Sequence, residues 1–144
     1  MLVNAILRVV HPELYFMARG AMEKLHEEAE LTELLEIWAS VFNGCQILSN
    51  RETPLHRDNN SCWEWYDLLC SIGPYADASF ELPGVGLRFP YDTGVIVAIC
   101  GRILRHGVSV ANGDRICIAY YMRENVQRRL SSQLATWNRR LNYV

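Results

Sequence analysis

The chain has 144 residues, half of them apolar, and a formal net charge of −2 at neutral pH. That length allows one domain with a substantial core and is too short for two, and the small net charge gives no overall sign of nucleic-acid binding. The charges are unevenly placed, because residues 1–101 carry 6 basic and 14 acidic side chains whereas residues 102–144 carry 8 arginines and 2 acids. The last third of the chain is therefore either a surface for an anionic partner or an ordinary solvated face.

The cysteines and the first residues constrain the compartment. An odd number of widely spaced cysteines with no C-x-x-C pair argues against a secreted disulfide framework and a structural zinc site, and favours a reducing compartment. The apolar start "MLVNAILRVV" is interrupted by Asn4 and Arg8 and lacks a basic leader, so we interpret it as core rather than as a signal peptide. No segment approaches the roughly 20 apolar residues that span a bilayer. We therefore expect an intracellular protein with no membrane contact.

In chain order, a helical region precedes a region of strands. From Pro12 onward, apolar residues recur at helical spacing and predict two amphipathic helices, or one broken helix, over residues 12–39. From Val41 to Tyr121, short apolar runs alternate with turn residues, which predicts seven or eight strands. The runs are "VFNGCQIL", "WEWYDLLCSI", "ASFEL", "VGLRF", "GVIVAIC", "RILRHGVSV" and "DRICIAYYM". Helical spacing returns after Met122.

These elements predict the fold class and its organisation. We expect an α+β protein with a double-stranded β-helix (jelly-roll) core, N-terminal helices packed on that core, and a C-terminal helix. The single domain, residues 1–144, would comprise helical support over about residues 1–39, the jelly-roll core over residues 40–122, and a C-terminal helix over residues 123–144.

The segment "TPLHRDNN" contains a His-x-Asp pair, His56 and Asp58. In an extended strand the residues i and i+2 lie on the same face, about 7 Å apart, so both side chains can reach one ion while Arg57 faces the other way. Alone, the pair is equally explained by a polar turn between two strands. A third ligand is required, and His106 is the best choice because the other two histidines fall in the helical region.

The Asn112-Gly113 dipeptide supports this choice. It favours a two-residue type I′ turn that joins the strands on either side into a hairpin. In that register His106, Arg115 and Cys117 share one face. An arginine on the inner face of a small barrel is costly unless it meets an anion, so the hairpin would supply both a metal ligand and an anion site.

Two histidines and one carboxylate form the facial triad of non-haem Fe(II) oxygenases, which leaves open positions on the metal. Two of these positions can take the keto and carboxylate oxygens of a 2-oxo acid, and one can take dioxygen. Arg115 would hold the far carboxylate of that acid through a bidentate, charge-assisted pair.

The order of H-x-D, a distal histidine and an arginine nine residues later resembles the 2-oxoglutarate/Fe(II) dioxygenases, whose signature ends Arg-x-Ser. Here Cys117 replaces that serine. Longer stretches are similar to the TET/JBP family of nucleic-acid-base oxygenases, in its compact fungal form. They are "SNRETPLHRDNNS", "WYDLLCSIGPY", "GVIVAICGRILRHGV" and "GDRICIAYYMRENVQRRL".

The resemblance implies specific cofactors and roles. Fe(II) would be bound by His56, Asp58 and His106, and 2-oxoglutarate would be the co-substrate, with dioxygen. Arg115 would bind the co-substrate, with Cys117 beside it and a second arginine, Arg51, supplied from just before the His-x-Asp pair.

The substrate that the family implies is 5-methylcytosine in DNA, or a related methylated base, which is oxidised at its methyl group. DNA containing methylated bases would be the partner and the nucleus the location. Asn59, Asn60 and Ser61 follow the His-x-Asp pair closely enough to border the substrate, although the polarity of an exposed loop explains these residues equally well. We interpret five aromatic residues as core or barrel wall rather than as base-stacking platforms: Trp63, Trp65, Tyr66, Tyr120 and Tyr121.

Three alternatives share these features. A 2-oxoglutarate oxygenase acting on protein or on a small molecule would have the same four core residues. A cupin-type metal enzyme is a weaker alternative, because it would have a second histidine at position 58 and a glutamate soon after. A truncated, non-catalytic relative would keep the barrel and bind no base.

Overall fold

The computed structural model describes residues 1–131 and 133–139. The helices are α1 (Leu2–Val10), α2 (Pro12–Leu25), η1 (Ala29–Leu31), α3 (Thr32–Ile37), η2 (Pro83–Val85) and α4 (Glu124–Leu130). The strands are β1 (Gly44–Ser49), β2 (Thr53–His56), β3 (Asp67–Ile72), β4 (Tyr75–Ala76), β5 (Ser79–Leu82), β6 (Leu87–Pro90), β7 (Ile96–Ile99), β8 (His106–Val108), β9 (Asn112–Gly113) and β10 (Ile116–Tyr121).

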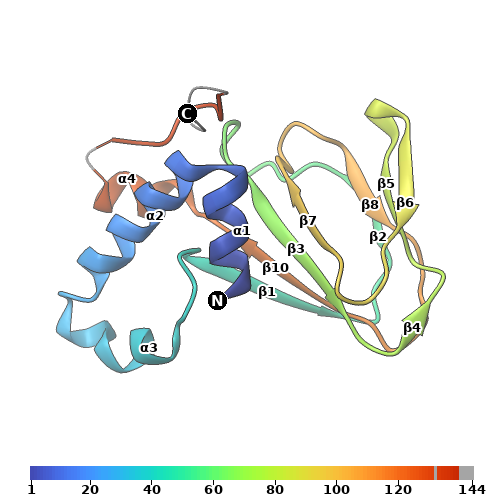
Figure 1. The fold of residues 1–144 in the computed structure, drawn as a ribbon, viewed down its shortest axis with the longest axis horizontal. Coiled ribbons are helices and arrows are strands. Elements are labelled where there is room, and N and C mark those ends of the chain that lie inside the picture. The colour runs from blue at the N-terminus through green and yellow to red at the C-terminus, as the bar shows by residue number, and fades with distance from the viewer. Residues whose placement is uncertain (132, 140–144) are drawn as a thin grey trace.

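The strands form two antiparallel four-stranded sheets and one short two-stranded pair. One sheet has the order β1-β10-β3-β7 and the other has the order β2-β8-β5-β6 (Figure 1). Each of the seven apolar runs contains a strand, but β2, β4 and β9 lie outside these runs, so the predicted number of seven or eight strands was too low. The α+β class with a jelly-roll-like core is confirmed. Apart from the β5-β6 pair, successive strands of the two large sheets alternate between them. Inward-facing residues distant in sequence can therefore meet in one interior.

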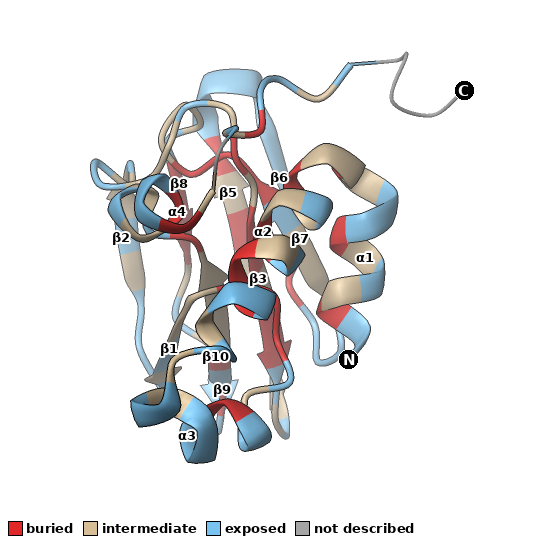
Figure 2. Ribbon diagram, turned by 90° about the vertical axis from the view of Figure 1, so that its left-hand side faces the viewer, coloured by how far each residue is buried: buried red, intermediate tan, exposed pale blue. Residues whose placement is uncertain are grey.

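The helices α1 and α2 cover the outer face of the β1-β10-β3-β7 sheet (Figure 1). Their apolar stripes supply Leu7, Leu14 and Ala18 to a core that also includes Leu68 and Cys70 of β3. A second core lies between the two sheets and is centred on Phe80, Tyr91 and Val108, with Leu69 of β3 packed against it. The strand β3 is therefore covered on both faces, as its buried residues in Figure 2 show. Its three successive apolar residues, 68–70, follow from that position.

The helix at the C-terminal end is shorter than its apolar spacing predicts, because α4 ends at Leu130 and residues 133–139 are not helical. Ala135 is nevertheless buried. Its carbonyl oxygen accepts a hydrogen bond from Trp65 Nε1 at 3.0 Å, and the N–H of Thr136 donates to Glu13 at 3.0 Å. The apolar spacing therefore reflects packing of a non-helical segment on the core. Residues 132 and 140–144 of the predicted helix lie outside the described residues.

The predicted hairpin at Asn112-Gly113 is wrong. The strands on either side of it belong to different sheets, because β8 pairs with β2 and β5 whereas β10 pairs with β1 and β3. Asn112 retains a negative φ, so the type I′ turn is not formed, and β9 pairs instead with β4. Gly113 has φ +112°, and a Cβ there would overlap the carbonyl oxygen of Pro74. The dipeptide thus lies in the segment that passes from one sheet to the other, where residue 113 must have a positive φ and lie close to the backbone of Pro74.

No helix in the part of the chain that the structure describes is long and apolar enough to cross a membrane.

Candidate active site

The two histidines of the predicted metal group lie opposite each other on neighbouring strands. His56 ends β2 and His106 begins β8, the two are paired in the antiparallel register, and their ring centroids are 4.4 Å apart. Asp58 lies in the loop two residues beyond β2, so the expected strand arrangement of the His-x-Asp pair does not occur. The loop instead turns the carboxylate back toward both rings.

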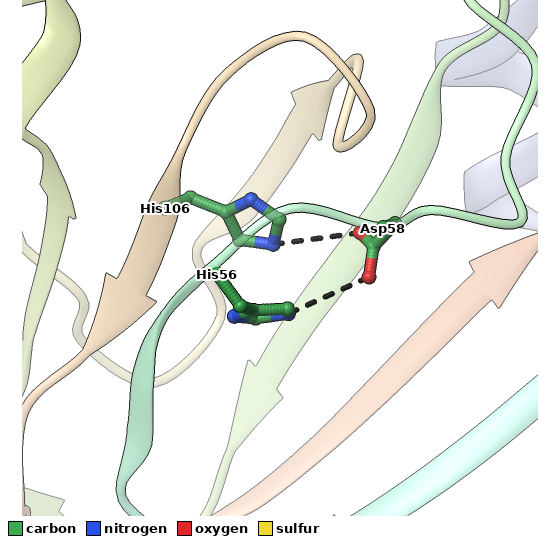
Figure 3. Close-up of side chains that lie close together, drawn as sticks. All are labelled: His56, Asp58 and His106. Carbon is green, nitrogen blue, oxygen red and sulfur yellow. Dashed lines mark ion pairs between the residues drawn. The ribbon is translucent and has the colours of Figure 1, made fainter.

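The three side chains converge (Figure 3). His56 Nε2 is 3.4 Å from Oδ1 of Asp58, and His106 Nε2 is 3.6 Å from Oδ2 of the same carboxylate. The potential ligand atoms all lie within 4.8 Å of one another, so this group could hold a metal ion. Two imidazoles and one carboxylate form a donor set that suits Fe(II) and leaves positions open for other ligands.

Backbone carbonyls fix the orientation of both rings. The Nδ1 atom of His56 lies 2.8 Å from the carbonyl oxygen of Pro54, and Nδ1 of His106 lies 2.9 Å from that of Leu104. Because a carbonyl oxygen only accepts, each Nδ1 carries the proton and each Nε2 presents its lone pair toward Asp58. Burial lowers the pKa of His106, which keeps this imidazole neutral and able to bind a metal at neutral pH. Phe80 stacks on the ring of His106 at 6.0 Å.

A turn holds the loop that carries Asp58. The N–H of Asp58 donates to the carbonyl oxygen of Gly101 at 3.0 Å, and the N–H of Ser61 donates to the carbonyl oxygen of Asp58 at 3.1 Å. The guanidinium of Arg57 donates to the carbonyl oxygen of Ile103 at 3.0 Å, which ties the same loop to the segment before β8. The carboxylate is therefore positioned by contacts between two loops distant in sequence.

The group borders a cavity of about 390 Å³ between the two sheets. His56, His106 and Val108 line one wall, and alternate residues of β10 and β3 line the other. The cavity is within the size range of about 300–1,000 Å³ that is usual for small-molecule sites. Its lining residues include Gln46, Leu48, Thr53, Arg57, Asn59, Asn60, Ser61, Asp67, Leu69, Tyr91, Arg115, Cys117, Ala119, Tyr121 and Arg123.

Arg115 is a buried cation in the wall of this cavity, with 2% of its surface exposed. Its Nε donates to Ser71 Oγ at 2.9 Å, its Nη1 donates to the carbonyl oxygen of Arg51 at 3.4 Å, and its guanidinium lies 5.0 Å from the ring centroid of Tyr91. Its Nη2 is buried and has no hydrogen-bond partner among the described residues. A buried guanidinium with an unused donor is costly in isolation, so the site fits an anionic ligand such as a carboxylate.

Cys117 and Arg51, the other two residues predicted to bind the co-substrate, differ in their position relative to the cavity. Cys117 is buried, lines the cavity, and has its Sγ 3.8 Å from the hydroxyl of Tyr91. The side chain of Arg51 is exposed and lines a smaller neighbouring cavity that also contacts Arg115. The structure therefore brings Cys117 to the cavity, whereas Arg51 reaches Arg115 through its backbone carbonyl alone.

Asn59, Asn60 and Ser61, which were predicted to border the substrate, line the cavity. Ser61 also donates a hydrogen bond from Oγ to Oδ2 of Asp67 at 3.2 Å. Burial, and secondly the charge of Asp58, raise the pKa of Asp67 to about 7. Sequence reasoning missed Asp67, although a single acid in the apolar run "WYDLLCSI" is a signal that could have identified it.

Several other residues that build the site were also missed. Ser71 and Tyr91 hold the guanidinium of Arg115, and Gly101 holds the Asp58 loop. The contact of Gly44 with the ring of Tyr121 was missed too: a Cβ on Gly44 would overlap this ring, which lines the cavity. These contacts join strands and loops that are far apart in the sequence, so no local pattern marks them.

Comparison with known protein families agrees with this geometry. The family model Tet_JBP, described as an oxygenase domain of the 2OGFeDO superfamily, matches residues 1–124. The chain therefore belongs to the Tet_JBP family, and it is an oxygenase domain of the 2-oxoglutarate- and Fe(II)-dependent dioxygenase superfamily. The cofactors that this superfamily implies are Fe(II) and 2-oxoglutarate. No curated protein gives a significant match to the chain.

Proposed function

We propose that this chain uses Fe(II), 2-oxoglutarate and dioxygen to hydroxylate the methyl group of 5-methylcytosine, or of a related methylated base, in DNA. The observation that carries the proposal is the presence, in one cavity, of the His56/Asp58/His106 group and the buried guanidinium of Arg115. Family membership supports the assignment to the oxygenases. That the substrate is a methylated base in DNA is our proposal, and product analysis tests it.

In this proposal His56, Asp58 and His106 bind the iron through their Nε2 and carboxylate atoms. When bound, the iron supplies the activation of dioxygen, with conversion of 2-oxoglutarate to succinate and carbon dioxide and insertion of one oxygen atom into a C–H bond of the methyl group. The carbonyls of Pro54 and Leu104 accept from the two Nδ1 atoms, so the Nε2 atoms are the ring nitrogens that face the carboxylate and can bind a metal.

Arg115 binds the far carboxylate of 2-oxoglutarate through its unused Nη2 donor. Ser71, Tyr91 and the carbonyl of Arg51 hold the guanidinium in place before the co-substrate arrives, which reduces the ordering cost of binding. The thiol of Cys117 lies beside this end of the cavity and contributes a weaker contact than a hydroxyl would.

The remaining part of the cavity accepts the methylated base. Tyr121 provides an aromatic ring, and Ser61, Asp67, Asn59 and Asn60 provide polar groups that can pair with the edge of a base. A base in a duplex must leave the stack to reach this interior. A DNA substrate would place the protein in the nucleus of a eukaryotic cell.

The test combines product analysis with metal binding. Methylated and unmethylated oligonucleotides are incubated with the full chain, Fe(II) and 2-oxoglutarate, and base oxidation and succinate are quantified together by mass spectrometry. We expect hydroxymethylated base and succinate in equal amounts from methylated DNA. The product should be lost in His106→Ala and retained in His26→Ala, which removes an exposed histidine of the helical region.

Three results would contradict different parts of the proposal. Succinate release without base oxidation would reject DNA and favour an oxygenase that acts on protein or on a small molecule. Unchanged Fe(II) affinity in His106→Ala would show that the metal group is wrongly assigned. A chain that binds neither iron nor 2-oxoglutarate would be the non-catalytic relative.

A further inference from the structure

A groove of about 770 Å³ lies beside the cavity. It shares Asn59, Asn60, Ser61 and Arg123 with the cavity lining, so the groove adjoins the cavity. We call it the basic groove, and its remaining lining residues are Arg102, Glu124, Asn125, Val126 and Arg128. A strand that reaches the cavity past these four shared residues would lie along the groove.

The groove carries a net positive charge. Three arginines face one glutamate, and that glutamate, Glu124, pairs with Arg128 at 2.5 Å. Among the described residues, no carboxylate lies within ion-pair distance of Arg102 or Arg123. These two cations are therefore available to an external anion.

Aromatic stacking holds the same two guanidinium groups in place. Arg102 lies 4.4 Å above the ring of Trp63, and Arg123 lies 4.7 Å above the ring of Tyr121. Arg102 also donates from Nη1 to the carbonyl oxygen of Asn59, and its Nε is buried with no hydrogen-bond partner among the described residues. Stacked guanidinium groups lose little freedom when they bind a phosphate, which favours binding at these two positions.

The side chains around Arg102 and Arg123 favour a nucleic-acid strand over other anions as the ligand of the basic groove. The side chain of Trp63 is 52% exposed, contrary to its interpretation as core or barrel wall, and it presents an aromatic surface next to Arg102. Asn59, Asn60 and Asn125 add neutral amides that can bond phosphate oxygens and sugars. Cations, amides and an exposed aromatic ring beside a base-sized cavity match the chemistry of a nucleic-acid strand better than that of an acidic polypeptide.

We propose that the basic groove binds the phosphodiester backbone next to the reacting nucleotide, with Arg102, Arg123 and Arg128 contacting phosphates and Trp63 stacking on a neighbouring base. This inference rests on the proposed function, because it deepens the assignment of the cavity to a base in DNA. It names the surface that holds the strand while the base occupies the cavity.

Binding is measured without turnover, by fluorescence anisotropy of a labelled methylated oligonucleotide with the full chain, Fe(II) and 2-oxoglutarate under anaerobic conditions. Arg102→Gln and Arg128→Gln should each raise Kd by about 5- to 10-fold at moderate salt, which corresponds to about 1–1.4 kcal/mol. Each should also reduce the slope of log K against log salt by about one, because one phosphate contact is lost. Trp63→Ala should weaken binding with no change in the salt slope.

Two variants serve as matched controls. Arg88→Gln removes an exposed arginine of β6 that pairs with Glu81 away from the groove, so it should leave Kd and the salt slope unchanged. Glu124→Gln removes the one acid of the groove and should tighten binding. A purely structural role for these residues would not produce opposite changes from removing a cation and removing an anion.

The inference is overturned if Arg102→Gln and Arg128→Gln bind as tightly as the wild type, or if polyglutamate competes as well as DNA per unit charge. Its failure is distinguishable from failure of the proposed function. Arginine-dependent binding without base oxidation would reject the oxidation and keep the groove. Base oxidation with arginine-independent binding would reject the groove and keep the oxidation.

Discussion

Gly101 packs directly against the carboxylate of Asp58. A Cβ on Gly101 would overlap Oδ2 of Asp58 and would come within 3.2 Å of Oδ2 of Asp67. The carbonyl of Gly101 also accepts the N–H of Asp58 at 3.0 Å. The absence of a side chain at residue 101 therefore lets two loops approach closely enough to aim Asp58 at the two histidines.

Gly101→Ala should lower the affinity for Fe(II) by about 10- to 100-fold, the range found when groups that orient metal ligands are changed. The added methyl group must displace the carboxylate of Asp58, whereas the two imidazoles are untouched. Anaerobic calorimetric titration of Fe(II) measures this. Gly84→Ala is the control, because a Cβ at Gly84 meets nothing within 4 Å. Equal Fe(II) affinity in Gly101→Ala and the wild type would mean that Asp58 is not a metal ligand.

Arg115→Ala should raise the Kd of 2-oxoglutarate by at least about 30-fold, because loss of one partner of a buried charge pair costs about 2–5 kcal/mol. Arg115→Lys should recover only part of the loss, since an ammonium cannot reproduce the fork that also bonds Ser71. The charge-transfer absorption of the anaerobic complex with Fe(II) reports co-substrate binding. Fe(II) affinity should stay unchanged in both variants, and Arg19→Ala, on the exposed face of α2, is the control. Unaltered 2-oxoglutarate binding would place the anion site elsewhere.

The strands and the His-x-Asp pair could be predicted because their signals are local. Each apolar run contains one strand, and the two residues of the His-x-Asp pair lie within a segment of three residues, 56–58. The meeting of His106 with Arg115 was predicted from a hairpin that does not exist. Both residues do line one cavity, because β8 and the start of β10 face each other from opposite sheets. A turn dipeptide indicates the local backbone conformation. Which sheet each flanking strand joins depends on pairing with distant strands, and no local sequence pattern reports that pairing.

The residues that hold the site residues in place were also not predicted, because they act through contacts that are distant in sequence. Gly101, Ser71 and Tyr91 act through contacts to residues 24 to 44 positions away, such as Ser71 and Tyr91 with Arg115. No spacing pattern announces such contacts. The length of the last helix was misjudged for a related reason, because apolar spacing reports burial and Ala135 is buried without being helical.

Cys117→Ser should lower the Kd of 2-oxoglutarate by a few fold. A hydroxyl is a stronger hydrogen-bond donor than a thiol, and a neutral hydrogen bond contributes about 0.5–1.5 kcal/mol. Burial raises the pKa of Cys117, so the wild-type residue is a protonated thiol and no charge is lost in the substitution. The same anaerobic absorption titration measures the effect, and Cys45→Ser outside the cavity lining is the control. A Kd that rises or stays constant would show that Cys117 does not contact the co-substrate.

Asp67→Asn should make the metal-free protein more stable at alkaline pH. Burial, then the charge of Asp58, raise the pKa of Asp67 from 3.8 to about 7. Between these values the folded chain retains a proton that the unfolded chain has lost, so the stability contributed by this group falls as the pH rises toward 7. The asparagine has no charge to bury and can still accept the hydrogen bond from Ser61.

The difference in unfolding free energy between Asp67→Asn and the wild type should therefore increase from pH 4 to pH 7 and stay constant above it. Its upper limit is about 4 kcal/mol, since one pKa unit corresponds to about 1.36 kcal/mol. Urea unfolding at pH 5, 6, 7 and 8 measures the difference in metal-free protein. Bound Fe(II) should reduce the difference, because it compensates the charge of Asp58 that raises the pKa of Asp67. A difference that is constant from pH 5 to pH 8 would show that Asp67 titrates normally and is exposed to water in solution.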